Sequence, residues 1–118
     1  MNERQRRGAQ AEERAARFLE RQGLAILARN FRTRLGEIDL VARDGQTLVF
    51  IEVRLRVSRA FGGAQASVDA RKQAKLLAAA RLYLSRLKAE PPCRFDVVTF
   101  EDALAESPRW LQGAFGAA

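Results

Sequence analysis

Residues 36–56 read GEIDLVARDGQTLVFIEVRLR, and this stretch decides the fold. It predicts two strands joined by a tight turn at Asp44-Gly45, because a two-residue type I′ loop needs positive φ at both central positions. With these two residues as the loop, we expect Glu37 to face Glu52 across the strand pair. Two carboxylates directly opposite each other repel, which is unusual for a hairpin with a purely structural role.

Acidic and basic side chains share one face of this hairpin. Side chains alternate between the faces of a strand and directly paired residues share a face, so one face carries Glu37, Asp39, Glu52 and Arg54. A divalent cation would remove the repulsion, since Mg²⁺ binds one or two carboxylates together with water and substrate phosphate. The alternative is an ordinary charged face in contact with water. In the expected register Asp39 faces Phe50, and an aromatic side chain there argues against a fully solvated face.

The chain is strongly basic, with 21 Lys and Arg residues against 14 Asp and Glu and a net charge of +7. Eighteen of the basic residues are Arg, whose planar guanidinium pairs well with phosphate. Such a charge is typical of nucleic-acid binding, although a generally Arg-rich composition would look the same. Composition does not separate DNA from RNA. The 118 residues, 47% of them hydrophobic, predict one domain over 1–118.

The sequence contains no histidine, and Cys93 is its single cysteine. This excludes Ser-His and Cys-His nucleophilic pairs, histidine-bound zinc and an internal disulfide. Chemistry here must use carboxylates, Lys, Arg, hydroxyls or a bound metal. No apolar run approaches the ~20 residues of a membrane span, and no hydrophobic segment follows the charged N-terminus. We therefore expect a cytoplasmic protein with no membrane partner.

Helix and strand patterns continue on both sides of the hairpin. Capping, glycine and proline signals predict helices over 3–22 and 67–88 and strands over 24–32, 94–101 and 109–111. Gly23 ends the first helix and Ser67 caps the second. We expect residues 1–6 and 113–118 to fray. One hairpin face is apolar and should pack against a helix; it consists of Val49, Ile51, Val53 and Leu55.

Glu12 lies on the margin of the buried stripe of the first helix, four residues after Gly8 and three before Ala15. A carboxylate that faces inward is destabilising unless something pairs with it. Its own helix offers no partner at the right spacing. Glu12 either stays at the solvated edge, or meets a strand arginine, or reaches the hairpin site as a further carboxylate.

Basic residues gather after the hairpin and at the start of the second helix. The loop between them, residues 58–66, contains glycines that allow close backbone approach. We expect contacts with nucleic acid from Arg56, Arg59, Gly62, Arg71, Lys72 and Lys75. Phe61 could stack on a base or anchor the loop to the core.

The order helix, strand, hairpin, helix, strand, with Asp39 followed by Glu52-Val53-Arg54, resembles the PD-(D/E)XK nuclease core. Over residues 8–101 the chain more closely resembles the YraN family of uncharacterised bacterial proteins, which are similar to archaeal Holliday-junction resolvases. The most specific feature is Gly-Glu-Ile-Asp-Leu at 36–40 combined with Phe-Ile-Glu-Val at 50–53. The match also includes Gly8, Glu12, Asn30, Gly62, Lys72 and the run 94–98.

This resemblance implies an α/β fold, with a mixed sheet of about four to five strands flanked by helices. The expected core is restriction-endonuclease-like, in the order α-β-β-β-α-β. Asp39 and Glu52 would bind Mg²⁺ or Mn²⁺, with the Val53 carbonyl as a further ligand, and Glu12 would assist. Arg54 occupies the superfamily's lysine position, where the lysine positions or activates the attacking water. Arginine keeps the charge but cannot act as a base near neutral pH.

Three functions stay open at this point. The first is a metal-dependent DNA endonuclease acting on branched or recombination-intermediate DNA, and by analogy with junction resolvases it would work as a homodimer. The second is a non-catalytic DNA-binding module that serves a recombination or repair complex. The third is an RNA-binding protein. Glu12, Asp39 and Glu52 favour the endonuclease, and Arg54 favours the non-catalytic module.

Overall fold

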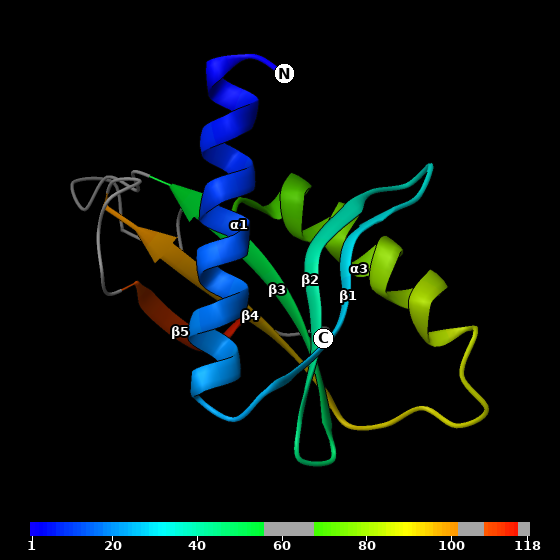
Figure 1. The fold of residues 1–118 in the computed structure, drawn as a ribbon. Helices are drawn as coiled ribbons and strands as arrows, with labels where there is room; N and C mark the ends of the chain where they lie inside the picture. The colour runs from blue at the N-terminus through cyan, green and yellow to red at the C-terminus, as the bar shows by residue number, and fades with distance from the viewer. Residues whose placement is uncertain (56–67, 102–107, 116–118) are drawn as a thin grey trace.

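The computed structural model describes residues 1–55, 68–101 and 108–115. The elements in chain order are α1 (Glu3–Arg21), β1 (Ala25–Arg32), β2 (Glu37–Asp44), β3 (Thr47–Leu55), α3 (Ala70–Leu84), β4 (Cys93–Phe100) and β5 (Arg109–Phe115) (Figure 1). The strands form one sheet in sequential order, in which β3 and β4 are parallel and the other neighbours antiparallel. This confirms the predicted mixed sheet flanked by helices.

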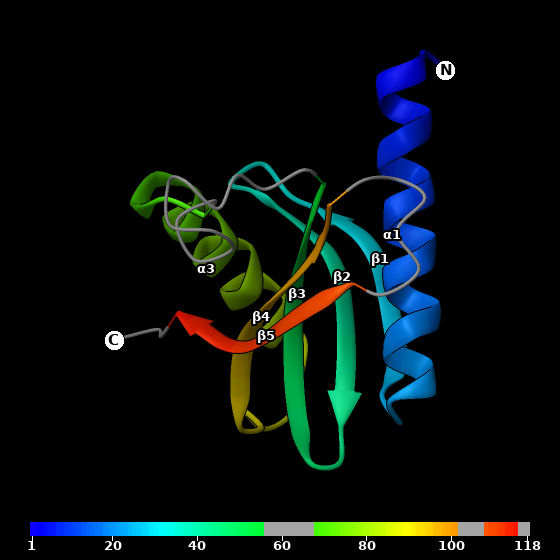
Figure 2. The same ribbon diagram turned by 90° about the vertical axis from the view of Figure 1, so that its left-hand side faces the viewer.

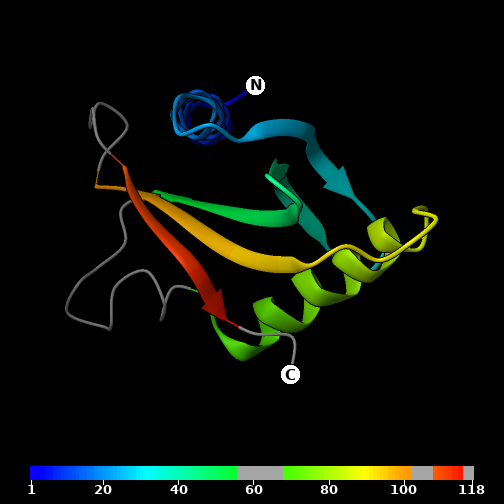
Figure 3. The same cartoon turned by 90° about the horizontal axis from the view of Figure 1, so that it is seen from below.

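The two helices cover opposite faces of the sheet (Figure 3). Residues alternate between the faces along β3, so Val49 and Ile51 join Leu19 of α1 in one core cluster. Phe50 points the other way and joins Leu76 of α3 in a second cluster. The prediction that the apolar hairpin face packs against a helix is confirmed, and that helix is α1. Neither helix in the described ranges has the length and apolar character needed to cross a membrane.

The turn between β2 and β3 differs from the expected one. Asp44 pairs with Thr47, so Gly45 and Gln46 form the loop. Gly45 has a φ of +60° and Gln46 does not take a positive φ. This is the pattern of a type II′ turn, which needs glycine only at the first loop position. Arg94 of β4 holds Asp44 at the strand end, with 3.0 Å between Nη2 and Oδ2.

The first turn of α1 is ordered by a capping box. The side chain of Asn2 accepts a hydrogen bond from the Gln5 N–H at 2.8 Å, and the Gln5 side chain accepts one from the Asn2 N–H at 3.0 Å. These bonds satisfy N–H groups that have no partner within the helix. The helix begins at Glu3, as predicted, and the expected fraying of residues 1–6 stays a prediction.

The second predicted helix, α3, starts later and ends earlier than expected. Its N-cap is Asp69, whose Oδ1 accepts a hydrogen bond from the Lys72 N–H at 2.8 Å. The predicted cap, Ser67, lies outside the described residues. α3 ends at Leu84 rather than near Lys88. After it the N–H groups of Arg86 and Leu87 bond to carbonyls three residues back, as in a tighter turn.

β5 continues to Phe115, so the last strand is longer than the predicted 109–111. Asp96 of β4 is fully buried and accepts hydrogen bonds from the Gly113 N–H at 3.0 Å and from Trp110 Nε1 at 2.9 Å. Phe115 stacks on Phe95 with 5.0 Å between the ring centroids. These contacts fix the strand against β4. Residues 116–118 lie outside the described part of the chain.

Candidate functional site

The sheet forks where β2 and β3 separate. Their pairing ends at Leu40 and Ile51, although both strands continue, and Figure 1 shows these ends spreading apart. Beyond the last pair, the Val53 N–H donates to Asp39 Oδ2 at 2.8 Å. A side-chain carboxylate therefore takes the place of a strand carbonyl as the acceptor.

The observed register changes which two carboxylates meet. Leu40 pairs with Ile51, so Asp39 and Glu52 are the next residues along the two strands, and the charge of Asp39 acts on the pKa of Glu52. The expected pairing of Glu37 with Glu52 is wrong, because it rested on a type I′ turn at Asp44-Gly45. The shared face is unchanged, since a shift by an even number of residues does not turn a strand over. The fork thus brings together Asp39 and Glu52.

Glu52 is buried, with 4% of its surface exposed. Its Oε1 lies 3.5 Å from Lys72 Nζ and 3.7 Å from Arg54 Nη1. Among the described residues its Oε2 has no hydrogen-bond partner. Burial of an unpaired carboxylate oxygen is strongly unfavourable, so this atom marks a place where a ligand would stabilise the protein.

The two fork carboxylates are shifted toward their neutral forms. Burial, followed by the neighbouring charge of Asp39, raises the pKa of Glu52 from 4.5 to about 7, against the opposing charges of Lys72 and Arg54. Burial also raises the pKa of Asp39, against the hydrogen bond from the Val53 N–H. Desolvation outweighs the local cations in both groups. The side chains around the fork therefore stabilise the ionised forms of these two carboxylates incompletely.

This donor set fits a hard divalent cation. Mg²⁺ commonly takes one or two carboxylates and completes its shell with water and phosphate oxygens. Asp39 and Glu52 offer two carboxylates, one of which has an unpartnered buried oxygen. In the described ranges no group of three or more acidic, histidine or cysteine side chains is close enough to form a metal site. Val53 lies at the fork through its N–H, and its carbonyl as a ligand stays a prediction.

Glu12 approaches the fork from α1. Its pKa is raised from 4.5 to about 7, first by burial and then by the charges of Asp39 and Glu37, with Arg32 opposing. With its amide oriented to donate, Asn30 Nδ2 lies 2.9 Å from Glu12 Oε1. Glu12 is therefore within electrostatic reach of Asp39, and its predicted assisting role stays a prediction.

The basic residues of α3 divide into two kinds. Lys72 turns toward Glu52, whereas Arg71 and Lys75 are exposed. The sequence contained a signal for this difference, because Lys72 precedes the buried Leu76 by four residues and so shares its helix face. Three further expected contacts lie outside the described residues: Arg56, Arg59 and Gly62. Lys72 as part of the fork was missed by the sequence reasoning.

Comparison with known proteins identifies relatives along most of the chain. The family model described as "Uncharacterised protein family UPF0102" matches residues 11–100. A UPF0102 protein of Cupriavidus taiwanensis is 57% identical over 116 residues, which cover 97% of this chain and 86% of the relative. A UPF0102 protein of Pseudomonas aeruginosa is 51% identical, with 94% and 93% covered. One of Janthinobacterium sp. is 48% identical, with 93% and 87% covered. These names give a family and no activity.

Proposed function

This chain belongs to the uncharacterised protein family UPF0102, also known as YraN, and from the chemistry of its fork we propose that it is a metal-dependent endonuclease that cleaves DNA. The observation that carries the proposal is the pairing of two carboxylates at a buried fork. The charge of Asp39 adds to burial in raising the pKa of Glu52, and one Glu52 oxygen has no hydrogen-bond partner among the described residues. Such perturbed carboxylates are typical of functional sites.

Asp39 and Glu52 would hold Mg²⁺ or Mn²⁺. When bound, the cation supplies a Lewis acid for the phosphoryl oxygen and lowers the pKa of a coordinated water. Lys72 and Arg54 lie beside Glu52 Oε1, at 3.5 and 3.7 Å. Their positive charges would stabilise the charge that develops on the phosphoryl group. The raised pKa of Glu12 suits a group that accepts a proton near neutral pH.

Lys72 would supply the lysine that the sequence lacks at position 54. The resemblance led us to expect a lysine in β3, and arginine at that position cannot serve as a base. Lys72 brings an ammonium group from α3 to the same carboxylate oxygen that Arg54 approaches. We therefore assign to Lys72 the orientation of the attacking water. DNA, rather than RNA, and a branched structure are proposed from the resemblance to junction resolvases.

A second candidate is a DNA-binding module without catalysis, which would serve a recombination or repair complex. The observation that favours it is the pair of cations already beside Glu52. Lys72 and Arg54 partly neutralise this carboxylate, and a divalent cation would have to compete with them.

The deciding experiment compares cleavage of duplex, single-stranded, flapped and four-way-junction DNA with Mg²⁺ or Mn²⁺. Glu52→Gln should abolish cleavage. Lys72→Met should lower the cleavage rate by about 100-fold or more, the effect expected when one charge-stabilising group is lost. Lys75→Met is the matched control, because it removes an exposed lysine from the same helix, and it should weaken binding without changing the cleavage rate of bound DNA.

Metal binding is tested separately by thermal unfolding. Mn²⁺ at about 100 times its dissociation constant should stabilise the wild-type protein by about 2.7 kcal/mol, and Asp39→Asn should remove this gain. Folded protein that binds DNA, cleaves none of the four substrates and gains no stability from either metal would overturn the endonuclease proposal and leave the binding module.

A further inference from the structure

A groove lies between the start of α1 and the end of β3. Figures 1 and 2 show the first turns of α1 extending beyond the end of β3. The groove has a volume of about 700 Å³, and its walls are formed by Glu3, Arg4, Arg7, Gly8, Arg54 and Leu55. A side chain added at Gly8 would meet nothing within 4 Å, so this part of the helix surface is open.

Arg54 connects this groove to the fork. Its guanidinium Nη1 lies 3.7 Å from Glu52 Oε1, and the same residue lines the groove. Arg4 and Arg7 line the same groove as Arg54. The groove and the fork therefore share Arg54.

The groove is positively charged, and the carboxylate of Glu3 partly neutralises its arginines. Among the described residues, its lining contains three guanidinium groups and one carboxylate, that of Glu3. Glu3 Oε1 lies 3.4 Å from Arg7 Nε, and both side chains are exposed. An exposed ion pair of this kind contributes little to stability, so a phosphate group can replace the Glu3 carboxylate as the partner of Arg7.

We propose that this groove binds the phosphodiester backbone of the DNA strand next to the fork, with Arg4 and Arg7 each contacting a phosphate. This deepens the proposed function and rests on it for the identity of the strand. Guanidinium groups bind phosphate oxygens in a bidentate manner, and the apolar side chain of Leu55 suits the sugar. The net charge of +7 favours a polyanion as the partner.

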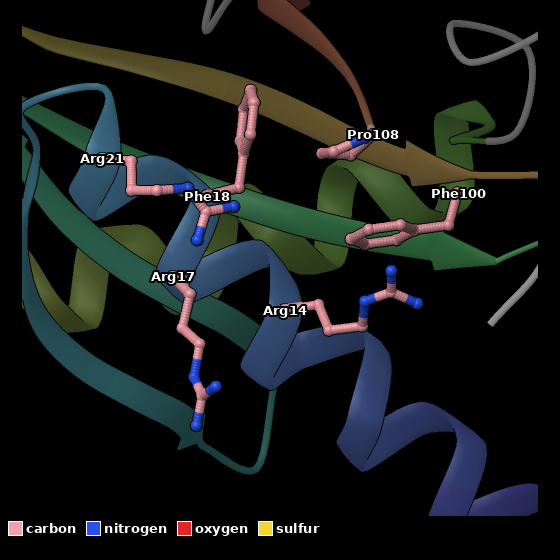
Figure 4. A pocket seen from close by; sticks show the side chains of 6 residues that line it. All are labelled: Arg14, Arg17, Phe18, Arg21, Phe100 and Pro108. Atoms are coloured by element: carbon pink, nitrogen blue, oxygen red, sulfur yellow. The ribbon is translucent and has the colours of Figure 1, made fainter. Parts of the chain in front are cut away.

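A second cavity on α1 provides a matched control. It has a volume of about 240 Å³ and is lined by Arg14, Arg17, Phe18, Arg21, Phe100 and Pro108 (Figure 4). Figure 4 shows Arg14 directed toward Phe100, and its guanidinium carbon lies 5.5 Å from the centre of that ring. Arg17 is paired with Glu13 four residues earlier, as Arg7 is with Glu3. Ten residues separate Arg7 from Arg17, which is about 15 Å along a helix.

The experiment compares two double variants, Arg4→Ala/Arg7→Ala and Arg17→Ala/Arg21→Ala. Both remove two positive charges from α1 and introduce a good helix former. Binding to a fluorescein-labelled four-way junction and to a duplex of one arm is measured by anisotropy between about 50 and about 300 mM KCl. Thermal unfolding confirms that each variant folds.

We expect the Arg4/Arg7 variant to bind DNA about 30-fold more weakly at 0.15 M salt. The slope of log affinity against log salt concentration should fall in magnitude by about 2, because each lost phosphate contact releases about 0.9 fewer counterions. The Arg17/Arg21 variant should lose less than about threefold, the residual effect of net charge. Glu3→Gln should tighten binding, because it frees Arg7 for phosphate.

Equal losses of affinity in the two double variants would overturn the proposal that the groove binds DNA, since only net charge would then matter. Unchanged binding by the Arg4/Arg7 variant would also overturn it. The same measurements distinguish this proposal from the endonuclease proposal. If no substrate is cleaved but binding is lost selectively in the Arg4/Arg7 variant, the DNA-binding role of the groove is supported and the endonuclease proposal is refuted. If Glu52→Gln abolishes cleavage but the Arg4/Arg7 variant binds normally, the endonuclease proposal is supported and the role of the groove is refuted.

Discussion

Replacing Glu52 by Gln should make the protein more stable at pH 8 while removing its proposed activity. Glutamine has nearly the shape of the protonated glutamate and carries no charge. Glu52 is 4% exposed and its Oε2 has no partner in the described part of the chain. The ionised carboxylate is therefore a source of instability that the substitution removes.

The magnitude follows from the raised pKa of Glu52. The shift from 4.5 to about 7 corresponds to about 3 kcal/mol at 1.36 kcal/mol per pH unit. The folded protein holds this proton more tightly than the unfolded chain, so between pH 4.5 and 7 the folded state binds more protons. The free energy of unfolding therefore falls as the pH rises through this window. Below it, wild type and variant should be nearly equal.

Thermal unfolding without divalent metal, at pH 5 and pH 8, measures this effect. For a domain of this size 3 kcal/mol corresponds to about 10 °C in Tm. We expect Glu52→Gln to melt about 10 °C above the wild type at pH 8 and within a few degrees of it at pH 5. Asp96→Asn is the control. Asp96 is equally buried but accepts hydrogen bonds from Trp110 and Gly113, so its substitution should lower Tm at both pH values.

The reasoning would be refuted by a Glu52→Gln variant that melts below the wild type at pH 8. That result would mean that the contacts of Glu52 with Lys72 and Arg54 stabilise the fold more than burial of the charge destabilises it. Glu52 would then be an ordinary structural ion-pair partner. A wild-type Tm that does not change between pH 5 and pH 8 would contradict the raised pKa itself.

Three further predictions concern the framework and the surface. A Cβ at Gly36 would lie 2.8 Å from the carbonyl carbon of Lys75 and closer still to its oxygen, so Gly36→Ala should lower the free energy of unfolding by about 2 kcal/mol in urea titrations. Asn2→Ala removes the cap that accepts from the Gln5 N–H and should cost about 1 kcal/mol, measurable by the same titration. Arg71→Ala combined with Lys75→Ala removes two exposed cations of α3 and should reduce the salt slope of DNA binding by about 2; an unchanged slope would remove both from the contact surface.

Local patterns determined most of the secondary structure. Alternation with a period of two assigned Val49 and Ile51 to one face of β3 and Phe50 to the other, and the structure confirms this division. The same alternation placed Asp39 and Glu52 on a common face. This holds for both two-residue turns, at 44–45 and at 45–46, because they differ by an even register shift and an even shift leaves the faces unchanged. The absence of histidine limited the chemistry to carboxylates, cations and a metal.

Errors in the sequence reasoning occurred where two local signals competed. Asp44-Gly45 fits a type I′ turn, but Gly45 alone at the first loop position also fits type II′. The ion pair between Arg94 and Asp44 joins residues 50 positions apart in the chain and keeps Asp44 in the strand. At the C-terminus, the hydrogen bond from the Gly113 N–H to Asp96 joins residues 17 positions apart, and the last strand extends past the predicted end at residue 111.

By itself, the sequence determined the elements, the faces of the strands and the residue types available for chemistry, because these depend on neighbours a few positions away. Only the tertiary structure decided that Asp39 meets Glu52, that Lys72 joins them from α3 and that Arg7 lies in one groove with Arg54. The physical reason is that these contacts are set by the register of a turn and by the packing of a helix on a sheet. Neither can be read from the residues that make the contact.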